Sequence, residues 1–177
     1  MVITRREVNF AGAAVCALLL GYAYYLQYFG HLEPCPLCIF QRIAVLALAV
    51  VFLIAALHDP QKTGARIYGV LIDLAALAGI AVAARHIYIQ SLPPGQVPSC
   101  GATLDYMLEV FPLTQVIRTV LTGSGECGVV DWTFLGLSMP WWVLISLTLL
   151  GAMGLVANWR LPRRRPPQLQ RSEPYIG

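Results

Sequence analysis

Four long apolar stretches, separated by polar segments, dominate the pattern of hydrophobic and polar positions along this chain. They cover approximately residues 10–29, 39–57, 67–87 and 140–159, and none is interrupted by an internal proline. A helix needs about 20 apolar residues to cross the hydrocarbon core of a bilayer. The pattern therefore predicts an all-α membrane protein with four transmembrane helices. The short connections between the first three favour an up-down bundle of antiparallel neighbours.

The composition supports the membrane class and excludes others. Hydrophobic residues make up 58% of the chain and charged residues only 12%, whereas a soluble domain carries about 25% charged residues. The basic residues lie at a few junctions rather than on one face, which excludes a nucleic-acid-binding surface. We expect one transmembrane domain over residues 1–161. The segment 162–177, rich in Pro, Arg and Gln, is expected to be a disordered cytoplasmic tail.

The lysines and arginines predict the orientation of the bundle. Arg5 and Arg6 precede the first stretch, Lys62 and Arg66 separate the second from the third, and four arginines lie within 160–165. The positive-inside rule places these groups and both termini in the cytoplasm. The connections 30–38 and 90–139 then face the other side. The first stretch is longer than the 7–15 apolar residues of a signal peptide, so we expect a retained helix.

Five cysteines carry the candidate chemistry. Cys35 and Cys38 form a C-x-x-C unit at the start of the second helix, and Cys100 and Cys127 lie in the long connection before the fourth. All four are expected on the non-cytoplasmic side, whereas Cys16 lies inside the first helix and is expected to be an apolar filler. Two thiol pairs facing an oxidising compartment indicate redox exchange or structural bridges.

The first pair has features of a reactive centre. A helix N-terminus favours the thiolate form of a cysteine, and Arg42 lies four residues after Cys38, hence on the same helical face. Arg42 would stabilise a Cys38 thiolate, or would extend to the lipid headgroups. A static disulfide is the alternative for the pair. His31 is close in sequence, but a fourth ligand is not evident, so a metal site is not expected.

The second pair lies in flexible surroundings. A disulfide between Cys100 and Cys127 would restrain the loop by roughly 3 kcal/mol on the chain-entropy model. Glycine, serine and proline flank both cysteines, which favours sulfurs presented to another protein. Residues 111–121 follow a mostly helical apolar spacing but are too short to span. We expect a short helix that lies on the membrane surface or packs over the top of the bundle.

The ordered set of these features resembles the DsbB family of bacterial inner-membrane disulfide oxidases. The resemblance rests on the four spans, the outward Cys35-Pro36-Leu37-Cys38, Arg42, the outward Cys100 and Cys127, and the segment 132–140 before the fourth span. It implies an enzyme that reoxidises a periplasmic DsbA-like thioredoxin-fold protein. The electrons would pass to a membrane quinone, ubiquinone or menaquinone.

The resemblance also implies roles for single residues. Cys100 would form the mixed disulfide with the partner, and Cys127 would be its partner in the loop. Cys35 would exchange with the loop pair, and Cys38 would contact the quinone. Arg42 and His86 match family positions near the quinone.

Two other readings and one unexplained residue remain at this point. A vitamin K epoxide reductase-like enzyme uses similar chemistry, but its loop pair precedes the C-x-x-C, the reverse of the order here. A membrane protein with static structural disulfides is the non-enzymatic alternative.

Asp73 lies within the third span, where a carboxylate is costly. It would be buried as a neutral acid or face Arg66, and it has no place in the mechanism.

Overall fold

The computed structural model describes residues 4–93, 112, 114, 125–128, 130 and 132–162, and four long helices dominate it. Each helix is long and apolar enough to cross a membrane, and each contains one of the predicted apolar stretches. This confirms the predicted four-helix membrane fold. The elements are α1 (Arg5–Phe29), α2 (Pro36–His58), α3 (Lys62–Gln90), the 3-10 helix η1 (Gly125–Gly128), β1 (Thr133–Phe134), β2 (Leu137–Ser138) and α6 (Met139–Arg160).

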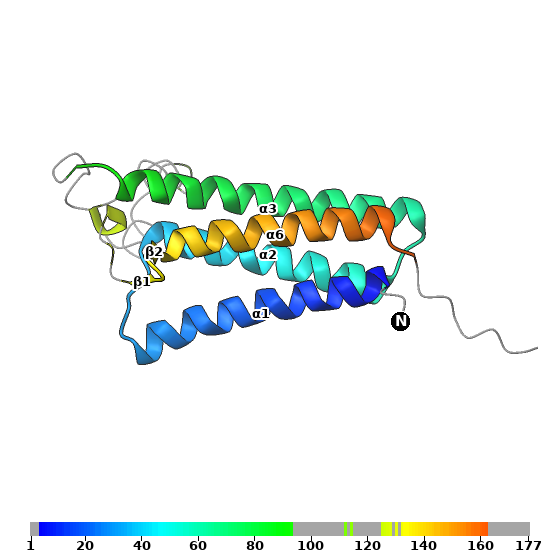
Figure 1. Ribbon diagram of the computed structural model, residues 1–177, viewed down its shortest axis with the longest axis horizontal. Coiled ribbons are helices and arrows are strands. Elements are labelled where there is room, and N and C mark those ends of the chain that lie inside the picture. The colour runs from blue at the N-terminus through cyan, green and yellow to red at the C-terminus, as the bar shows by residue number, and fades with distance from the viewer. Residues whose placement is uncertain are drawn as a thin grey trace, which may run out of the picture.

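The helices run alternately up and down, as the short connections predict (Figure 1). α3 and α6 lie side by side along their length, and α2 packs beside them (Figure 1). α1 packs mainly on α2 and diverges from the other helices toward the end of the bundle that carries β1 and β2 (Figure 1). The candidate site lies at this open end.

Prolines mark the beginnings of two helices near that end. Pro36 occupies the first turn of α2 and Pro140 the first turn of α6, where the missing N–H of proline costs no hydrogen bond. Cys35 is the N-cap residue of α2. Helix α2 therefore begins within the C-x-x-C unit, three residues before the predicted apolar stretch 39–57.

The core is built around Phe52, which is fully buried. Its ring fits against two glycines, Gly12 of α1 and Gly154 of α6. Small residues at such positions let membrane helices approach closely. Cys16 lies in the same apolar cluster and is fully buried, as expected for an apolar filler.

We predict that Gly154→Ala destabilises the bundle. The added Cβ would lie 2.5 Å from Ile72 Cγ2 and 3.0 Å from Phe52 Cε1, and such overpacking costs about 1–3 kcal/mol. The midpoint of thermal unfolding in detergent, followed by circular dichroism, should fall. Gly21→Ala is the matched control, because nothing lies within 4 Å of its Cβ position. Equal midpoints for the two variants would contradict close packing at Gly154.

Polar contacts hold α1 at the opposite end of the bundle. The side-chain amides of Asn9 and Asn158 donate to each other at 3.1 and 2.9 Å, and both residues are buried. Arg5 lies 3.5 Å from a carboxylate oxygen of Asp59 and donates to the carbonyl of Pro60. These contacts tie the beginning of α1 to α6 and to the α2–α3 turn, so that α1 separates from the bundle only at its other end.

Asp73 does not form the ion pair considered from the sequence. It is half-buried near Gly151 of α6. The guanidinium of Arg66 instead lies over the ring of Trp159, 5.8 Å from its centre. Within the described residues, Arg66 and Asp73 are not joined by a salt bridge.

Candidate functional site

Cys35 and Cys38 lie together at the N-terminus of α2. The backbone N–H of Cys38 donates to Cys35 Sγ at 3.3 Å, and the two sulfurs are 2.9 Å apart in hydrogen-bonding contact. A disulfide would bring the sulfurs to about 2.0 Å, so the pair is present as a dithiol. Cys35 is the N-cap residue of α2. Cys38 follows it by three residues, so the first helical turn places both side chains on the same side of the helix.

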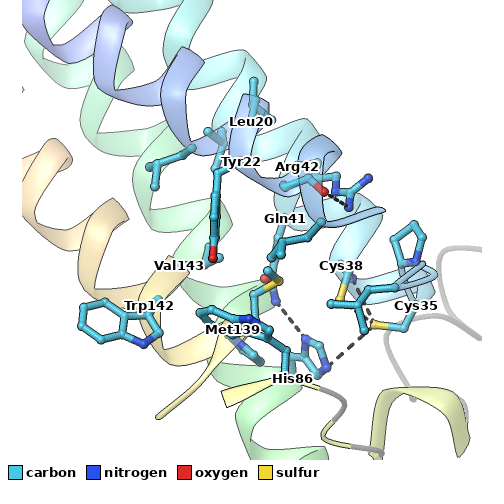
Figure 2. A pocket seen from close by; sticks show the side chains of 18 of the residues that line it. Leu20, Tyr22, Cys35, Cys38, Gln41, Arg42, His86, Met139, Trp142 and Val143 are labelled. Atoms are coloured by element: carbon cyan, nitrogen blue, oxygen red, sulfur yellow. Dashed lines mark hydrogen bonds between the residues drawn. The ribbon is translucent and has the colours of Figure 1, made fainter. Parts of the chain in front are cut away.

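His86 of α3 approaches this pair from the neighbouring helix. Its Nε2 lies 3.8 Å from Cys35 Sγ, and its Nδ1 lies 3.1 Å from the amide nitrogen of Gln41 (Figure 2). An amide nitrogen only donates, so in this arrangement Nδ1 accepts and Nε2 carries the proton. His86 therefore presents an N–H to the sulfur of Cys35. Both His86 and Gln41 are only 3% exposed, which restricts the ring to this orientation.

Cys127 lies at the same end of the bundle as Cys35 and Cys38. It belongs to η1, is fully buried, and packs in an apolar cluster with Leu37 and Ile89. Cys35 packs against this cluster. The structure thus brings the second cysteine pair to the first through Cys127. Cys100 and the short helix expected at 111–121 lie outside the described residues, apart from the isolated positions 112 and 114.

Arg42 is anchored to α1 rather than to either sulfur. Its guanidinium donates to the carbonyl of Ala23 at 3.1 Å and to the side-chain oxygen of Gln27. It also lies over the ring of Tyr24, 5.1 Å from the centre. Arg42 shares its helical face with Cys38 as expected, but its long side chain reaches across to the neighbouring helix.

The side chains of the C-x-x-C, Arg42 and His86 line one cavity of about 160 Å³ between the open end of α1 and the other helices. Its walls are mostly apolar and come from α1, α2 and α6 (Figure 2). Five polar side chains line the wall from the start of α2 and the facing turn of α3, namely Cys35, Cys38, Gln41, Arg42 and His86. Glu33, Gln90 and Ser146 are further polar residues of the lining.

A small hairpin supports another part of the cavity wall. β1 and β2 pair antiparallel, and the turn between them has positive φ at Leu135 (51°) and Gly136 (78°). The indole N–H of Trp142 donates to the carbonyl of Phe134 at 3.1 Å, which ties the hairpin to α6. Trp132, just before the hairpin, lines the cavity and meets Tyr22 edge-on. Sequence reasoning noticed this segment only as a motif.

The third donor beside the cysteine pair is His86, not the His31 considered from the sequence. The donor atoms of Cys35, Cys38 and His86 all lie within 4.8 Å of one another. His31 is exposed in the connection after α1. Sequence reasoning also missed Gln41, although a polar residue in the second turn of an apolar membrane helix is itself a signal.

Comparison with known proteins places this arrangement in a family. The family described as "Disulfide bond formation protein DsbB" matches residues 5–157. A protein named disulfide bond formation protein B from Nitrosococcus oceani is 47% identical over 92% of this chain and 95% of its own. Its namesake from Methylococcus capsulatus is 51% identical over 86% and 93%. The one from Chromohalobacter salexigens is 51% identical over 90% and 94%.

The family match begins at the first residue of α1 and extends into α6, so it includes all or most of each of the four helices. The relatives are named for disulfide formation, and the dithiol beside an apolar cavity has the groups that such chemistry needs. The helices fit a multi-pass protein of a bacterial inner membrane. The chain therefore belongs to the DsbB family and is a membrane-embedded disulfide oxidoreductase.

Proposed function

We propose that this protein reoxidises a periplasmic DsbA-like thioredoxin-fold protein and passes the two electrons to a membrane quinone, ubiquinone or menaquinone. The observation that carries the proposal is the Cys35–Cys38 dithiol in the wall of an apolar cavity, with Cys127 packed beside Cys35. In the net reaction, the partner's dithiol becomes a disulfide, and the quinone gains two electrons and two protons.

The cavity fits a quinone ring. Its volume of about 160 Å³ is close to the roughly 150 Å³ of an engineered cavity that binds benzene. Apolar walls suit the ring, and hydrogen-bond donors on one side suit its carbonyl oxygens. Cys38, Arg42 and His86 are the residues that would hold it, and when bound it supplies an acceptor for an electron pair.

The distribution of charge supports a periplasmic position for the cysteines. α1 begins at Arg5, α3 begins at Lys62 and α6 ends at Arg160, and these three helix ends lie together at the end of the bundle away from the cavity (Figure 1). The positive-inside rule assigns that end to the cytoplasm. The cysteine end then faces the periplasm, where disulfides persist.

The packing of the cysteines supports an order of exchange. Cys127 contacts the cluster that includes Cys35, so electrons from the Cys100–Cys127 pair would enter the C-x-x-C through Cys35. The Nε2–H of His86 faces Cys35 Sγ and would stabilise this sulfur whenever it carries negative charge. The Cys127 thiolate would attack Cys35 of the Cys35–Cys38 disulfide and release Cys38 as a thiolate. Cys100 would then attack Cys127, close the Cys100–Cys127 disulfide and release Cys35, which leaves the C-x-x-C as a dithiol.

The proposal is tested by reconstituting the reaction. Purified protein in detergent, supplied with quinone and a reduced DsbA-like partner, should convert many equivalents of partner dithiol to disulfide. Quinone consumption and loss of partner thiols should agree at one to two. Static structural disulfides, the non-enzymatic alternative, predict neither quinone consumption nor partner oxidation.

We predict that His86→Leu slows the oxidation of the partner by about tenfold or more. A hydrogen bond to a charged group contributes about 1.5–3 kcal/mol, and leucine offers the charged sulfur no donor. His86→Gln keeps an N–H of similar reach and should retain more of the rate. The rate is measured by stopped flow at saturating quinone. Equal slowing by the two substitutions would show that His86 acts only through packing.

We predict that Arg42→Met raises the KM for quinone by about tenfold with a smaller effect on kcat. The substitution removes the two hydrogen bonds to α1, worth about 0.5–1.5 kcal/mol each, and loosens the wall of the cavity. Arg85→Met is the matched control. Arg85 stacks on Tyr88 at 5.2 Å in a similar cation–π contact but does not line the cavity. A raised KM in both variants would contradict a specific role for Arg42.

A further inference from the structure

We propose that the dithiol form of this protein binds a zinc ion through Cys35, Cys38 and His86, and that the ion reversibly blocks the redox centre. The donor atoms of all three residues lie within 4.8 Å of one another at the cavity (Figure 2). Binding of the ion does not depend on the proposed function. The block on turnover rests on the proposed function.

The distances are close to those of a zinc site. Zn–S bonds of about 2.3 Å and Zn–N bonds of about 2.0 Å in tetrahedral geometry separate sulfur and nitrogen by about 3.5 Å and two sulfurs by about 3.8 Å. Cys35 Sγ and His86 Nε2 are already 3.8 Å apart. The sulfurs, at 2.9 Å, must separate by about 0.9 Å when the ion binds.

The donor set has the chemistry of a zinc site with an open position. Thiolates and imidazole are the ligands that Zn²⁺ prefers over the hard cations. Two cysteines and one histidine, with the fourth position left to water, make up one known class of zinc centre. Among the residues that the structure describes, Cys35, Cys38 and His86 are the group of three such donors that converge. The fourth position would face the cavity.

Gln41 provides the outer support that such a histidine needs. A metal-bound histidine donates its other N–H to an oxygen, which fixes the ring. The side-chain amide of Gln41 lies 3.1 Å from His86 Nδ1, and turning this amide over places its oxygen there as the acceptor. Gln41 and His86 are both almost fully buried, so the pair is already ordered before an ion binds.

The site exists only in one redox state. Two thiols bind Zn²⁺ as thiolates and release two protons, with no change in oxidation state. When Cys35 and Cys38 form a disulfide, neither sulfur is a thiolate and only the imidazole remains. Zinc is therefore expected to trap the dithiol and to compete with the occupant of the cavity, and removal of zinc by a chelator should restore the centre.

The test titrates the full-length protein in detergent with Zn²⁺ against a chromogenic chelator, without quinone or partner. The dithiol form should bind one ion tightly, and the Cys35–Cys38 disulfide form should not compete. Gln41→Leu should weaken binding about 10–100-fold, and Cys38→Ser and His86→Ala at least as much. Cys16→Ser, which removes a buried thiol that does not line the cavity, and Cys100→Ser should leave the affinity unchanged.

An absorption spectrum of the wild-type protein with bound Co²⁺ tests the site without any variant that folds poorly. Co²⁺ added to the dithiol form should give thiolate-to-cobalt charge-transfer absorption, which Zn²⁺ displaces. Equal zinc affinity in both redox states, an unchanged affinity in folded His86→Ala, or loss of binding with Cys100→Ser would overturn the site. The proposed function is assayed separately, in the presence of chelator. A lack of quinone-dependent turnover would therefore not contradict the zinc site, and a lack of zinc binding would not contradict the proposed function.

Discussion

Replacing Cys38 by serine is expected to reduce quinone-dependent turnover to the rate without enzyme. Transfer of an electron pair from the C-x-x-C requires both sulfurs, because oxidation of the dithiol ends in a bond between Cys35 and Cys38. The two sulfurs are 2.9 Å apart and line the cavity together. A serine hydroxyl cannot form that bond, so exchange stops with Cys35 held in a disulfide to the loop pair.

The measurement is the absorbance change of the quinone during oxidation of a reduced partner. Cys16→Ser is the matched control, since Cys16 is fully buried in the apolar core and does not line the cavity. Its substitution should lower stability but retain turnover. If Cys38→Ser protein still reduces quinone in the presence of partner, Cys38 does not have the assigned role.

The fold was predictable because its determinants are local. The length and hydrophobicity of each apolar stretch predict a membrane helix without knowledge of its neighbours, and all four stretches lie in helices of the structure. The C-x-x-C was also placed correctly at a helix start. Pro36 favours the first turn, and Cys35 caps it.

The site was less predictable because it depends on contacts between helices. Cys35 and His86 are 51 residues apart in sequence, and only the packing of α2 on α3 brings them together. The helical face of Arg42 was correct, but the side chain extends to Ala23, since spacing within one helix does not say which neighbour a long side chain reaches.

The hairpin was missed for a different reason. Its two-residue turn places Leu135 at positive φ, where leucine is rare and asparagine or glycine is expected. Local propensity therefore gives no turn signal at Leu135. The contact of Trp142 with Phe134 and the position before α6 hold a conformation that the residue itself does not favour.

Replacing Cys100 by alanine is expected to prevent a covalent complex with the partner. Cys127 is fully buried beneath Leu37 and Ile89, so an incoming protein thiolate cannot approach its sulfur in line with a disulfide bond. The partner must then attack Cys100 and leave Cys127 as the departing thiolate, which is already next to Cys35. Burial of one sulfur thus directs the partner to the other.

The complex is trapped by mixing the reduced protein with oxidised partner, because the same mixed disulfide forms in the reverse direction. Non-reducing electrophoresis should show it for Cys127→Ala, which retains Cys100 and lacks the thiol that would resolve the bond. Cys100→Ala should show none. A complex that persists in Cys100→Ala and disappears only with a second cysteine substitution would mean that the partner reaches another sulfur. If that sulfur is Cys127, η1 would have to move during exchange so that its thiol becomes accessible to the partner.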